Sequence, residues 1–586
     1  MIDFEKAKED AFTALQTTLN ISVLSIKDKK VAGWPVDQDV WRVATEIFLP
    51  DGTVTPIVLF IKFPYEFPLV LPKIYLSKED YQWIRHIPHV NVEQHVCLFD
   101  DETITIDPAQ PVDIIKSCLR KAKQIIQDGL QKKNVDDFSD EFLAYWNDEY
   151  SARDKIVSSL SIISKDEKLT EPYIKFAVLN KPYRIYSYII FGQNDSAKRF
   201  RSYLEAEEYK ISEVDALYLG ELKGLEPPFI LSNQSAFELV TAKSSLPAKT
   251  YEQFIKKSDY PKVVLFSVLL KSTRLFFGWT VGTLNTERKG FRPGYFSKWD
   301  VYKTIQKHDP VTRLSFADLS RERLHDRTDS AVVEQKKYTL AFAGTGSIGS
   351  NLMHHLYTSE VEKLLLIDPD VLTIENINRH LLGLSYVQAH KVAALEHFFT
   401  IRNPFLQVAT HQTSVIKLVN DSPEILNSAD YLFVAIGKTN IEEYLVASLR
   451  EGRLTKPMFI LWVEPFLIGA HCLLINPGTS IDYQNLYADS LYKYNVLSED
   501  EYKDLDRQLL FREAGCQSSY VPYGQKSITL FLAGITPIIF DLMENRPSKN
   551  LRITWKGNAA IQKKLGLKLS TFGQRLEFGQ TLIEDL

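Results

Sequence analysis

Hydrophobic and polar positions at the beginning of the chain first follow helical spacing and then alternate. The helical spacing predicts an amphipathic helix over residues 1–25, whose apolar positions are Phe4, Ala7, Ala11, Leu15 and Leu19. Apolar side chains then alternate over 41–48 and 54–63, on either side of Pro-Asp-Gly at 50–52. Alternation around such a turn is the pattern of a β-hairpin.

A proline-dense stretch, FPYEFPLVLPKIYL, follows the hairpin and leads into an irregular segment. Beyond it, helices are predicted at 111–131 and 136–150, the second rich in acidic and aromatic residues. Together these elements indicate an α+β domain over residues 1–152.

The pattern between residues 155 and 325 is less regular. The apolar runs IYSYIIFG, VDALYLG and KVVLFSVLL are typical of buried strands, and they lie between helical or charged segments. They predict a middle α/β domain over 153–330, without a phosphate loop or a catalytic cluster. Residues 315–335 are highly charged and lead into the next domain.

From residue 338 the chain alternates between strand and helix patterns. YTLAFA, GTGSIGSNLMHHLYTS and VEKLLLID read as a βαβ unit. A helix at 387–399, strands at 431–436 and 458–463, and a helix at 529–543 continue the alternation. This predicts a Rossmann-like domain over 331–586, so the fold class is a multidomain α/β protein.

Composition narrows the class of protein. The 586 residues are 45% hydrophobic and 24% charged, which is typical of a globular chain, and the net charge of −5 argues against a broad nucleic-acid-binding surface. The four cysteines form no C-x-x-C pair, which argues against a cysteine zinc site and a disulfide framework. The acidic N-terminus and the interrupted apolar stretch at 528–542 indicate neither a secretory signal nor a membrane span, so we expect a cytoplasmic protein.

A glycine-rich loop stands between the first strand and helix of the last domain. Gly344, Gly346 and Gly349 fit G-x-G-x-x-G, which permits a tight turn and brings helix N–H groups to a phosphate. Asp368 ends the second strand, 19 residues after Gly349, where a carboxylate can accept hydrogen bonds from a ribose. The combination predicts a nucleotide site.

Polar and cationic residues after Asp368 favour a triphosphate over a dinucleotide. Asn376, Asn378, Arg379 and Lys391 supply two amides and two cations near the loop. A triphosphate needs its charge neutralised before attack at phosphorus, whereas hydride transfer has no such need. Taken singly, each of Arg379 and Lys391 is explained equally well as a solvent-exposed charge on a helix with no ligand to bind.

The elements GTGSIG, LLLIDPDVLTIENINRH and HK together resemble the ThiF-type adenylation domain of ubiquitin-activating enzymes and their bacterial sulfur-carrier relatives. The resemblance implies that Asp368 holds the ribose, that Asn376, Arg379 and Lys391 grip the triphosphate of ATP, and that a partner's C-terminal carboxylate becomes an acyl-adenylate. It also implies Mg²⁺. Where the family has a metal-binding Asp, this chain has Gly-Lys-Thr-Asn at 437–440, so the metal ligand stays open. Glu442 is one candidate, and Lys438 is an alternative partner for phosphate.

Two cysteines are candidate nucleophiles. Cys516 lies in FREAGCQSSYVPYG among polar neighbours, including Arg512, and in the activating relatives a thiol near this place carries the partner as a thioester. Cys118 and Cys472 lie in apolar patterns and are predicted to be core residues.

Cys97 lies in IPHVNVEQHVCLFD. The order of helix, hairpin, proline-rich segment, thiol and helix over residues 1–150 resembles the ubiquitin-conjugating fold. By that resemblance His89 or Asn91 donates a hydrogen bond to the oxyanion that forms when an amine attacks a thioester. A surface histidine in a turn is the alternative for His89.

A conjugating-type thiol domain joined to an activating-type domain resembles the fused ubiquitin-transferase enzymes of bacterial anti-phage (CBASS) operons. The resemblance implies that a cyclic-nucleotide synthase donates the carboxylate, that Cys516 passes it to Cys97, and that a lysine receives it. It also implies an inactive adenylation-like middle domain, a homodimer, and neither nucleic acid nor membrane as a partner. Two other functions stay open, namely a sulfur-carrier or cofactor-biosynthesis enzyme and a non-catalytic nucleotide-binding scaffold.

Overall fold

The computed structural model describes residues 3–99, 104–150, 154–164, 167–169, 172–180, 188–257, 261–270, 273–287, 289–292, 294–320, 323–324, 337–357, 360–479, 481–489, 491–503, 509, 511–512, 519–520, 522–557 and 559–586. They form two compact units, one of Met1–Lys198 with Leu204–Arg323 and the other of Arg199–Tyr203 with Leu324–Leu586.

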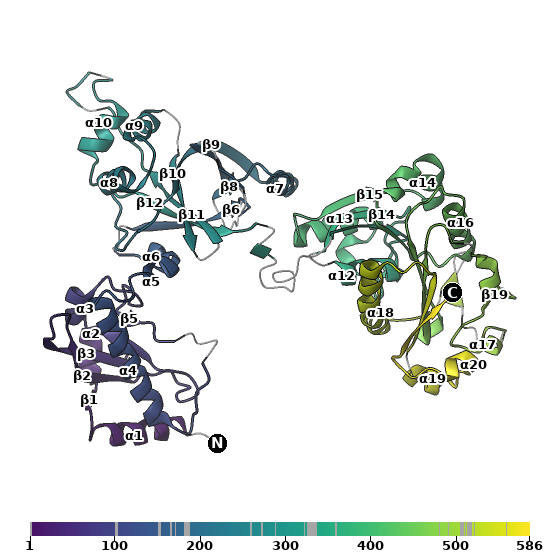
Figure 1. Ribbon diagram of the computed structural model, residues 1–586, viewed down its shortest axis with the longest axis horizontal. Helices are drawn as coiled ribbons and strands as arrows, with labels where there is room; N and C mark the ends of the chain where they lie inside the picture. The colour runs from purple at the N-terminus through teal and green to yellow at the C-terminus, as the bar shows by residue number, and fades with distance from the viewer. Residues whose placement is uncertain are drawn as a thin grey trace. The chain divides into compact units, whose positions relative to one another are not determined.

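The first unit begins with a five-stranded antiparallel sheet in the order β1-β2-β3-β4-β5, with α4 lying across it (Figure 1). The elements are α1 (Phe4–Leu15), β1 (Asn20–Val23), α2 (Ile26–Ala32), β2 (Val40–Phe48), β3 (Val54–Lys62), β4 (Lys73–Leu76), α3 (Lys78–Ile84), β5 (His95–Val96) and α4 (Pro111–Leu130).

The hairpin and the long helix predicted for this region are confirmed. Alternate residues of β3 (Ile57, Leu59 and Ile61) are buried, so one face of the strand packs in the core. The helix α4 begins with Pro111, whose fixed φ suits the first helical turn, and its apolar face packs on the same core.

The helix predicted at 136–150 is instead two short helices, α5 (Asp137–Asp140) and α6 (Phe142–Asn147). Their aromatic side chains belong to the core of the middle region. Trp146 is fully buried, and its indole N–H donates to the Leu314 carbonyl at 2.9 Å. The buried Arg313 guanidinium donates to the carbonyls of Trp146 and Asp148. The conjugating-type region is thereby anchored to the strands that follow it.

The middle region is a closed barrel in the strand order β10-β11-β12-β6-β8-β7-β9. Its elements are β6 (Lys155–Ile162), β7 (Tyr173–Asn180), β8 (Tyr188–Phe191), α7 (Asp195–Ala206), β9 (Lys210–Glu221), α8 (Asn233–Lys243), α9 (Ala248–Lys256), β10 (Lys262–Leu270), β11 (Thr273–Val281), α10 (Lys298–Asp300), the π-helical turn η1 (Val301–Ile305) and β12 (Thr312–Asp318).

Strands and helices are mixed in the barrel as predicted, but its topology differs from that of an adenylation-like domain. An adenylation domain has an open, mostly parallel sheet. Here β6 pairs in parallel with β8 and β12, and β9 pairs in parallel with β10, whereas β7 and β11 make antiparallel pairs with both of their neighbours. Closure depends on pairs between distant strands, which local patterns do not reveal.

The second unit is built on an eight-stranded sheet in the order β15-β14-β13-β16-β17-β18-β23-β24. The main elements are β13 (Tyr338–Ala343), α12 (Ser347–Leu356), β14 (Val361–Ile367), α13 (Lys391–Arg402), β15 (Gln407–His411), α14 (Val415–Asp421), α15 (Pro423–Asn427), β16 (Tyr431–Val434), α16 (Thr439–Arg450), β17 (Met458–Val463), β18 (Gly469–Ile475), α17 (Glu499–Lys503), α18 (Gln525–Asn545), β23 (Leu551–Lys556), α19 (Ala559–Leu565), α20 (Thr571–Gln574) and β24 (Thr581–Asp585). The short elements are η3 (Ile374–Asn376), η4 (Leu384–Tyr386), η5 (Pro465–Leu467), η6 (Tyr483–Leu486), β19 (Tyr487–Ala488), β20 (Leu491–Tyr492), β21 (Phe511–Arg512) and β22 (Ser519–Tyr520).

Helices cover both faces of this sheet. The first five strands are parallel and the last three antiparallel, with α12, α13 and α18 packed on one face and α14 and α16 on the other. The predicted Rossmann-like fold is thus confirmed. Because β13 and β16 are neighbours whose helices cover opposite faces, a crevice forms at their carboxyl ends, where nucleotides bind in such sheets.

One described helix, α18, has the length and apolar composition of a membrane span. Ile528, Phe531, Leu532, Ile535 and Ile539 on one side of it are buried in the core of the second unit. That packing accounts for the apolar composition of α18 within a folded core.

Candidate functional site

The glycine-rich loop follows β13 and turns directly into α12. Gly344 has a φ of 90°, a conformation that glycine adopts without strain. A Cβ at Gly349 would lie 2.0 Å from the Gly344 carbonyl oxygen, so a side chain there would break the turn. Gly346 precedes the first helical residue, Ser347, which leaves the N–H groups at the start of α12 facing the crevice.

Asp368, at the end of β14, fixes the conformation of this loop through hydrogen bonds. Its carboxylate is buried and accepts hydrogen bonds from the Thr345 N–H at 2.7 Å, the Thr345 hydroxyl at 3.1 Å and the Asp370 N–H at 2.9 Å. The acid therefore shapes the phosphate loop, and its contact with a ribose stays a prediction.

His380 is a second support of the loop that the sequence patterns did not identify. Its Nδ1 accepts from the Leu382 N–H at 3.0 Å, so the proton is on Nε2, which donates to the Thr345 carbonyl at 2.8 Å. Burial lowers the pKa of His380 to about 4, so the imidazole is neutral at pH 7. His380 lies directly after Arg379 in the sequence. It contacts Thr345, 35 residues earlier, only because the chain folds back, so no local pattern indicated this contact.

We expect acid to destabilise the second unit through His380. An imidazole in the unfolded chain takes up a proton near pH 6.5, whereas His380 in the folded protein stays neutral down to a pH of about 4. The neutral form therefore contributes its full stabilisation above pH 6.5 and loses it as the pH falls towards 4, a change of roughly 3 kcal/mol. Urea unfolding at pH 7.5, 6 and 5 should show a smaller pH dependence for His380→Gln than for wild type; equal slopes would contradict this assignment.

A pocket of about 500 Å³ opens beside the loop. Of the predicted residues, Gly346, Asn376, Arg379, Lys391 and Glu442 line it. Asn378 is exposed and is not among the described lining residues. The Asn376 amide oxygen accepts from the Thr373 N–H at 3.2 Å, which closes the turn at η3.

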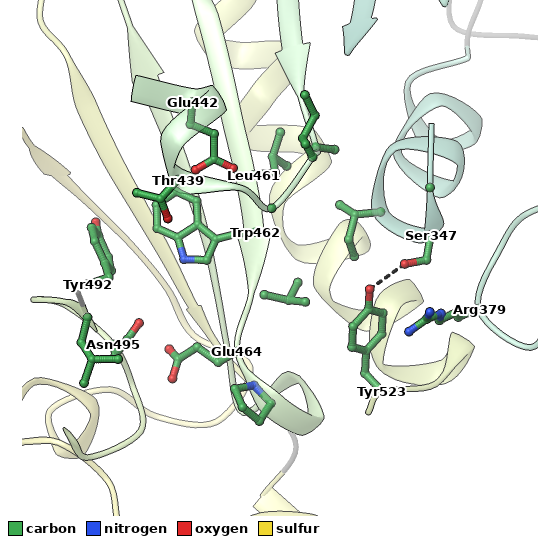
Figure 2. Close-up of a pocket in the computed structure, with 18 of the residues that line it drawn as sticks. Ser347, Arg379, Thr439, Glu442, Leu461, Trp462, Glu464, Tyr492, Asn495 and Tyr523 are labelled. Atoms are coloured by element: carbon green, nitrogen blue, oxygen red, sulfur yellow. Dashed lines mark hydrogen bonds between the residues drawn. The ribbon is translucent and has the colours of Figure 1, made fainter. Parts of the chain in front are cut away.

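Cations occupy the side of the pocket nearest the loop. The Arg379 guanidinium lies 5.7 Å from the centre of the Tyr523 ring, and the Tyr523 hydroxyl pairs with the Ser347 hydroxyl at 2.6 Å (Figure 2). Lys391 begins α13, and its ammonium pairs with Asp370 at 2.8 Å. Two cations and the start of α12 thus face one space, an arrangement that suits an anionic ligand with several phosphates.

The opposite side of the pocket is organised by Glu464, which follows β17 (Figure 2). Its Oε1 lies 2.8 Å from His471 Nε2 and accepts from the Val496 N–H at 2.7 Å. Its Oε2 accepts from the Leu497 N–H at 2.8 Å and the Tyr502 hydroxyl at 3.1 Å.

This fully bonded carboxylate holds the loop around 496 against the sheet. Gly469 permits the arrangement, because a Cβ there would lie 2.0 Å from Glu464 Oε1.

Glu442 tests whether the pocket could hold Mg²⁺. Its side chain is 2% exposed; Oε2 accepts from the Tyr483 hydroxyl at 2.9 Å, and Oε1 is buried without a hydrogen-bond partner. Burial raises the pKa of this carboxyl. Among the described residues, no group of three or more His, Cys, Asp or Glu side chains is placed to bind a metal. Glu442 therefore stays a candidate ligand, and the binding of Mg²⁺ stays a prediction.

Cys97 lies directly after β5 and is exposed. Its N–H donates to the His89 carbonyl at 2.8 Å, which attaches the thiol segment to the preceding loop. The Asn91 side-chain oxygen accepts from the N–H groups of Glu93 and His95, both at 3.0 Å. Asn91 therefore shapes the turn that leads to Cys97, and its amide N–H₂ is the group that would donate to an oxyanion.

His89 contacts α5 and α6 through both ring nitrogens. Nδ1 lies 2.7 Å from Glu141 and Nε2 lies 3.0 Å from Asp137. The hydrogen bond with Glu141 is the main cause that raises the pKa of His89. In this arrangement the ring fastens the loop before Cys97 to α5 and α6, and its bond to an oxyanion stays a prediction.

For the two other cysteines that the structure describes, the predicted position in the core is confirmed. Cys118 in α4 and Cys472 in β18 are buried. Burial raises the pKa of the Cys118 thiol to about 12 and raises that of Cys472 as well, so neither is a ready nucleophile. Cys516 lies outside the described residues, and its proposed role rests on the sequence.

Comparison with known proteins finds two family models that match this chain. Residues 36–154 match the family model of prokaryotic E2 family B, and residues 327–451 match the ThiF family. The chain thus joins a prokaryotic E2 domain to a ThiF domain.

Over 476 residues it is 21% identical to the ATP-dependent ubiquitin transferase-like protein Cap2 of Pseudomonas aeruginosa, covering 77% of this chain and 79% of that protein. It is a distant homologue of that protein.

A second similar protein and two solved structures match smaller parts. A Cap2 protein of Enterobacter hormaechei is 30% identical over 115 residues, 19% of each chain. The crystal structure of E. coli MccB with ATP matches 38% of this chain and 61% of its own, with 17% identity and a TM-score of 0.26. The structure of PaaA matches 37% of this chain and 60% of its own, with 16% identity and a TM-score of 0.28. The chain thus spans about three fifths of these two structures.

Proposed function

We propose that this chain activates the C-terminal carboxylate of a protein with ATP and passes the acyl group through Cys516 and Cys97 to a lysine amine. The observation that carries the proposal is the pairing, within one chain, of an exposed cysteine after β5 of an E2 domain with a cation-lined pocket at the glycine loop of a ThiF domain. Adenylation supplies the activated acyl group, and the E2 thiol passes it to the amine.

The pocket's own residues account for the adenylation step. Arg379, Lys391 and the N–H groups at the start of α12 would bind the triphosphate and neutralise charge on the departing pyrophosphate. A carboxylate oxygen of the donor attacks the α-phosphorus, forming an acyl-adenylate and releasing pyrophosphate. Mg²⁺, with Glu442 as its candidate ligand, would supply further charge neutralisation.

Two thiol transfers and an amide bond follow. The Cys516 thiolate attacks the acyl-adenylate and AMP leaves; the Cys97 thiolate then takes the acyl group and frees Cys516. A lysine amine attacks the Cys97 thioester; the new C–N bond yields the amide, the C–S bond breaks, and the Cys97 sulfur takes up the proton that the amine loses. Linking both domains in one chain raises the effective concentration of one thiol near the other.

The partners follow from the resemblance to fused CBASS enzymes. We propose that the donor is a cyclic-nucleotide synthase, that the protein acts as a cytoplasmic homodimer in bacterial anti-phage defence, and that neither nucleic acid nor membrane is a partner. The net charge of −5 is consistent with the absence of a nucleic-acid partner.

The test is mass spectrometry of the full chain co-expressed with its genomic neighbours. Non-reducing intact and peptide spectra should show a protein-sized adduct on Cys97 that dithiothreitol removes and that Cys516→Ala abolishes. Cys97→Ser should convert it to a thiol-resistant ester, which shows that the attachment uses that side chain. The adduct mass identifies the donor.

Other results would favour the other functions. If the donor is present and ATP–pyrophosphate exchange proceeds without an adduct on either thiol, the relay is wrong and a sulfur-transfer enzyme is favoured. Binding of ATP without exchange would favour a scaffold.

A further inference from the structure

A histidine lies beside the exposed thiol of the E2 domain. His95 and Cys97 are two residues apart at the end of β5, so their side chains project from the same face of the chain. His95 Nδ1 lies 3.9 Å from Cys97 Sγ, within the reach of a hydrogen bond to sulfur. An imidazole beside a thiol favours its ionisation.

The surrounding residues hold His95 in place. Its backbone N–H donates to the Asn91 side-chain oxygen at 3.0 Å, and its carbonyl accepts from the Asn91 N–H at 3.1 Å. Tyr75 is its partner across the β4–β5 ladder, with ring centres 5.0 Å apart and planes inclined by 46°. Main-chain bonds and ring packing therefore orient the imidazole.

We propose that His95 is the proton acceptor for the Cys97 thiol, so that Cys97 attacks the incoming thioester as a thiolate. The inference rests on the proposed function, in which Cys97 receives an acyl group. His95 would be a catalytic residue in its own right, because its Nδ1 contacts the reacting sulfur.

The proposed step balances without a further reactant. The Cys97 S–H bond breaks, its proton moves to His95 Nδ1, and the electron pair stays on sulfur. The thiolate forms a new C–S bond with the acyl carbon, and the bond from that carbon to the donor sulfur breaks. The departing thiolate keeps that electron pair and takes up the proton from the His95 imidazolium.

Among the described residues, ionisable groups near the pair include Tyr75 on β4, Tyr145 on α6 and Glu93 before β5. Burial raises the pKa of Tyr75 and of Tyr145, so both phenols are neutral over the pH range in which a thiol ionises. Glu93 lies near enough to influence Tyr75, and as an anion it stabilises an imidazolium rather than a thiolate. His95, whose Nδ1 contacts the Cys97 sulfur, is better placed than these groups to accept the proton.

The test measures thiol ionisation in the full chain and needs neither ATP nor a donor. The rate of Cys97 alkylation by iodoacetamide is followed from pH 5.5 to 10 by peptide mass spectrometry of wild type, His95→Gln and His95→Asn. His86→Gln is the control, because His86 lies in the neighbouring loop and is also a half-buried histidine.

We expect both His95 variants to react about tenfold more slowly than wild type at pH 7, with the apparent pKa of the thiol about one unit higher. Their rates should converge with wild type above pH 9.5, where the thiolate forms without help, and His86→Gln should match wild type throughout.

Superimposed curves for wild type and both His95 variants would overturn the proposal. A rate reduction of the same factor at every pH would overturn it too, since that indicates lost access or folding rather than lost proton transfer. The proposed function fails in a separate way, by the absence of a Cys97 adduct in the donor experiment. The two failures are therefore distinguishable.

Discussion

Replacing Arg379 with alanine is expected to lower kcat/KM for ATP–pyrophosphate exchange by about 10²- to 10³-fold. The guanidinium lines the pocket beside the start of α12 and stacks over Tyr523, so it faces the place where pyrophosphate gains charge as it leaves. A group that acts mainly on developing charge lowers kcat more than it raises KM. Exchange of radiolabelled pyrophosphate into ATP, with the donor carboxylate supplied, measures both constants.

Arg402→Ala provides a matched control. That guanidinium also lies over an aromatic ring, 5.3 Å from the centre of Phe398, but it is exposed at the end of α13 and does not line the pocket. The control should retain wild-type exchange. An Arg379→Ala enzyme as active as Arg402→Ala would show that Arg379 is a solvated helix charge, the alternative that the sequence left open.

Glu464→Ala is expected to destabilise the second unit by about 3–5 kcal/mol. The substitution leaves the N–H groups of Val496 and Leu497 and the side chains of His471 and Tyr502 without the acceptor around which they are arranged. Buried donors without a partner carry the full cost of desolvation. Urea unfolding gives the change, and hydrogen exchange should show lost protection at the amides of Val496 and Leu497.

Glu499→Ala is the control for this change. Glu499 is exposed and pairs with Lys503 within α17, so its loss should cost about 0.5 kcal/mol or less. If Glu464→Ala were as mild as this control, the carboxylate would not be what holds the loop around 496, and the far wall of the pocket would need another explanation.

Much of the fold could be predicted because local patterns determine it. Apolar alternation located β2 and β3, and the proline at position 111 marked the start of α4 to the residue. The strand β17 coincides with the predicted 458–463, while α13 begins four residues after the predicted 387, at Lys391. The shift arises because the turns around η4 occupy the residues that the apolar pattern had assigned to the helix.

The candidate site could be predicted only in part, for a physical reason. The glycine loop and its cations form a short motif, so sequence spacing was enough to select Gly346, Asn376, Arg379 and Lys391, which do meet in one pocket. The supports of the site depend on contacts between distant segments. His380 reaches back 35 residues to Thr345, and Glu464 reaches forward 32 residues to Val496. Barrel closure in the middle region was missed for the same reason.

The packing of α5 and α6 affects how this protein can be divided. Phe142 and Trp146 are buried against Phe229, Phe266 and Phe277 of the barrel region. A fragment cut at residue 152 would present these two rings to water as a contiguous apolar patch, the kind of surface that drives self-association. A soluble fragment that retains Cys97 therefore has to extend through β12, or replace those aromatic side chains with polar ones.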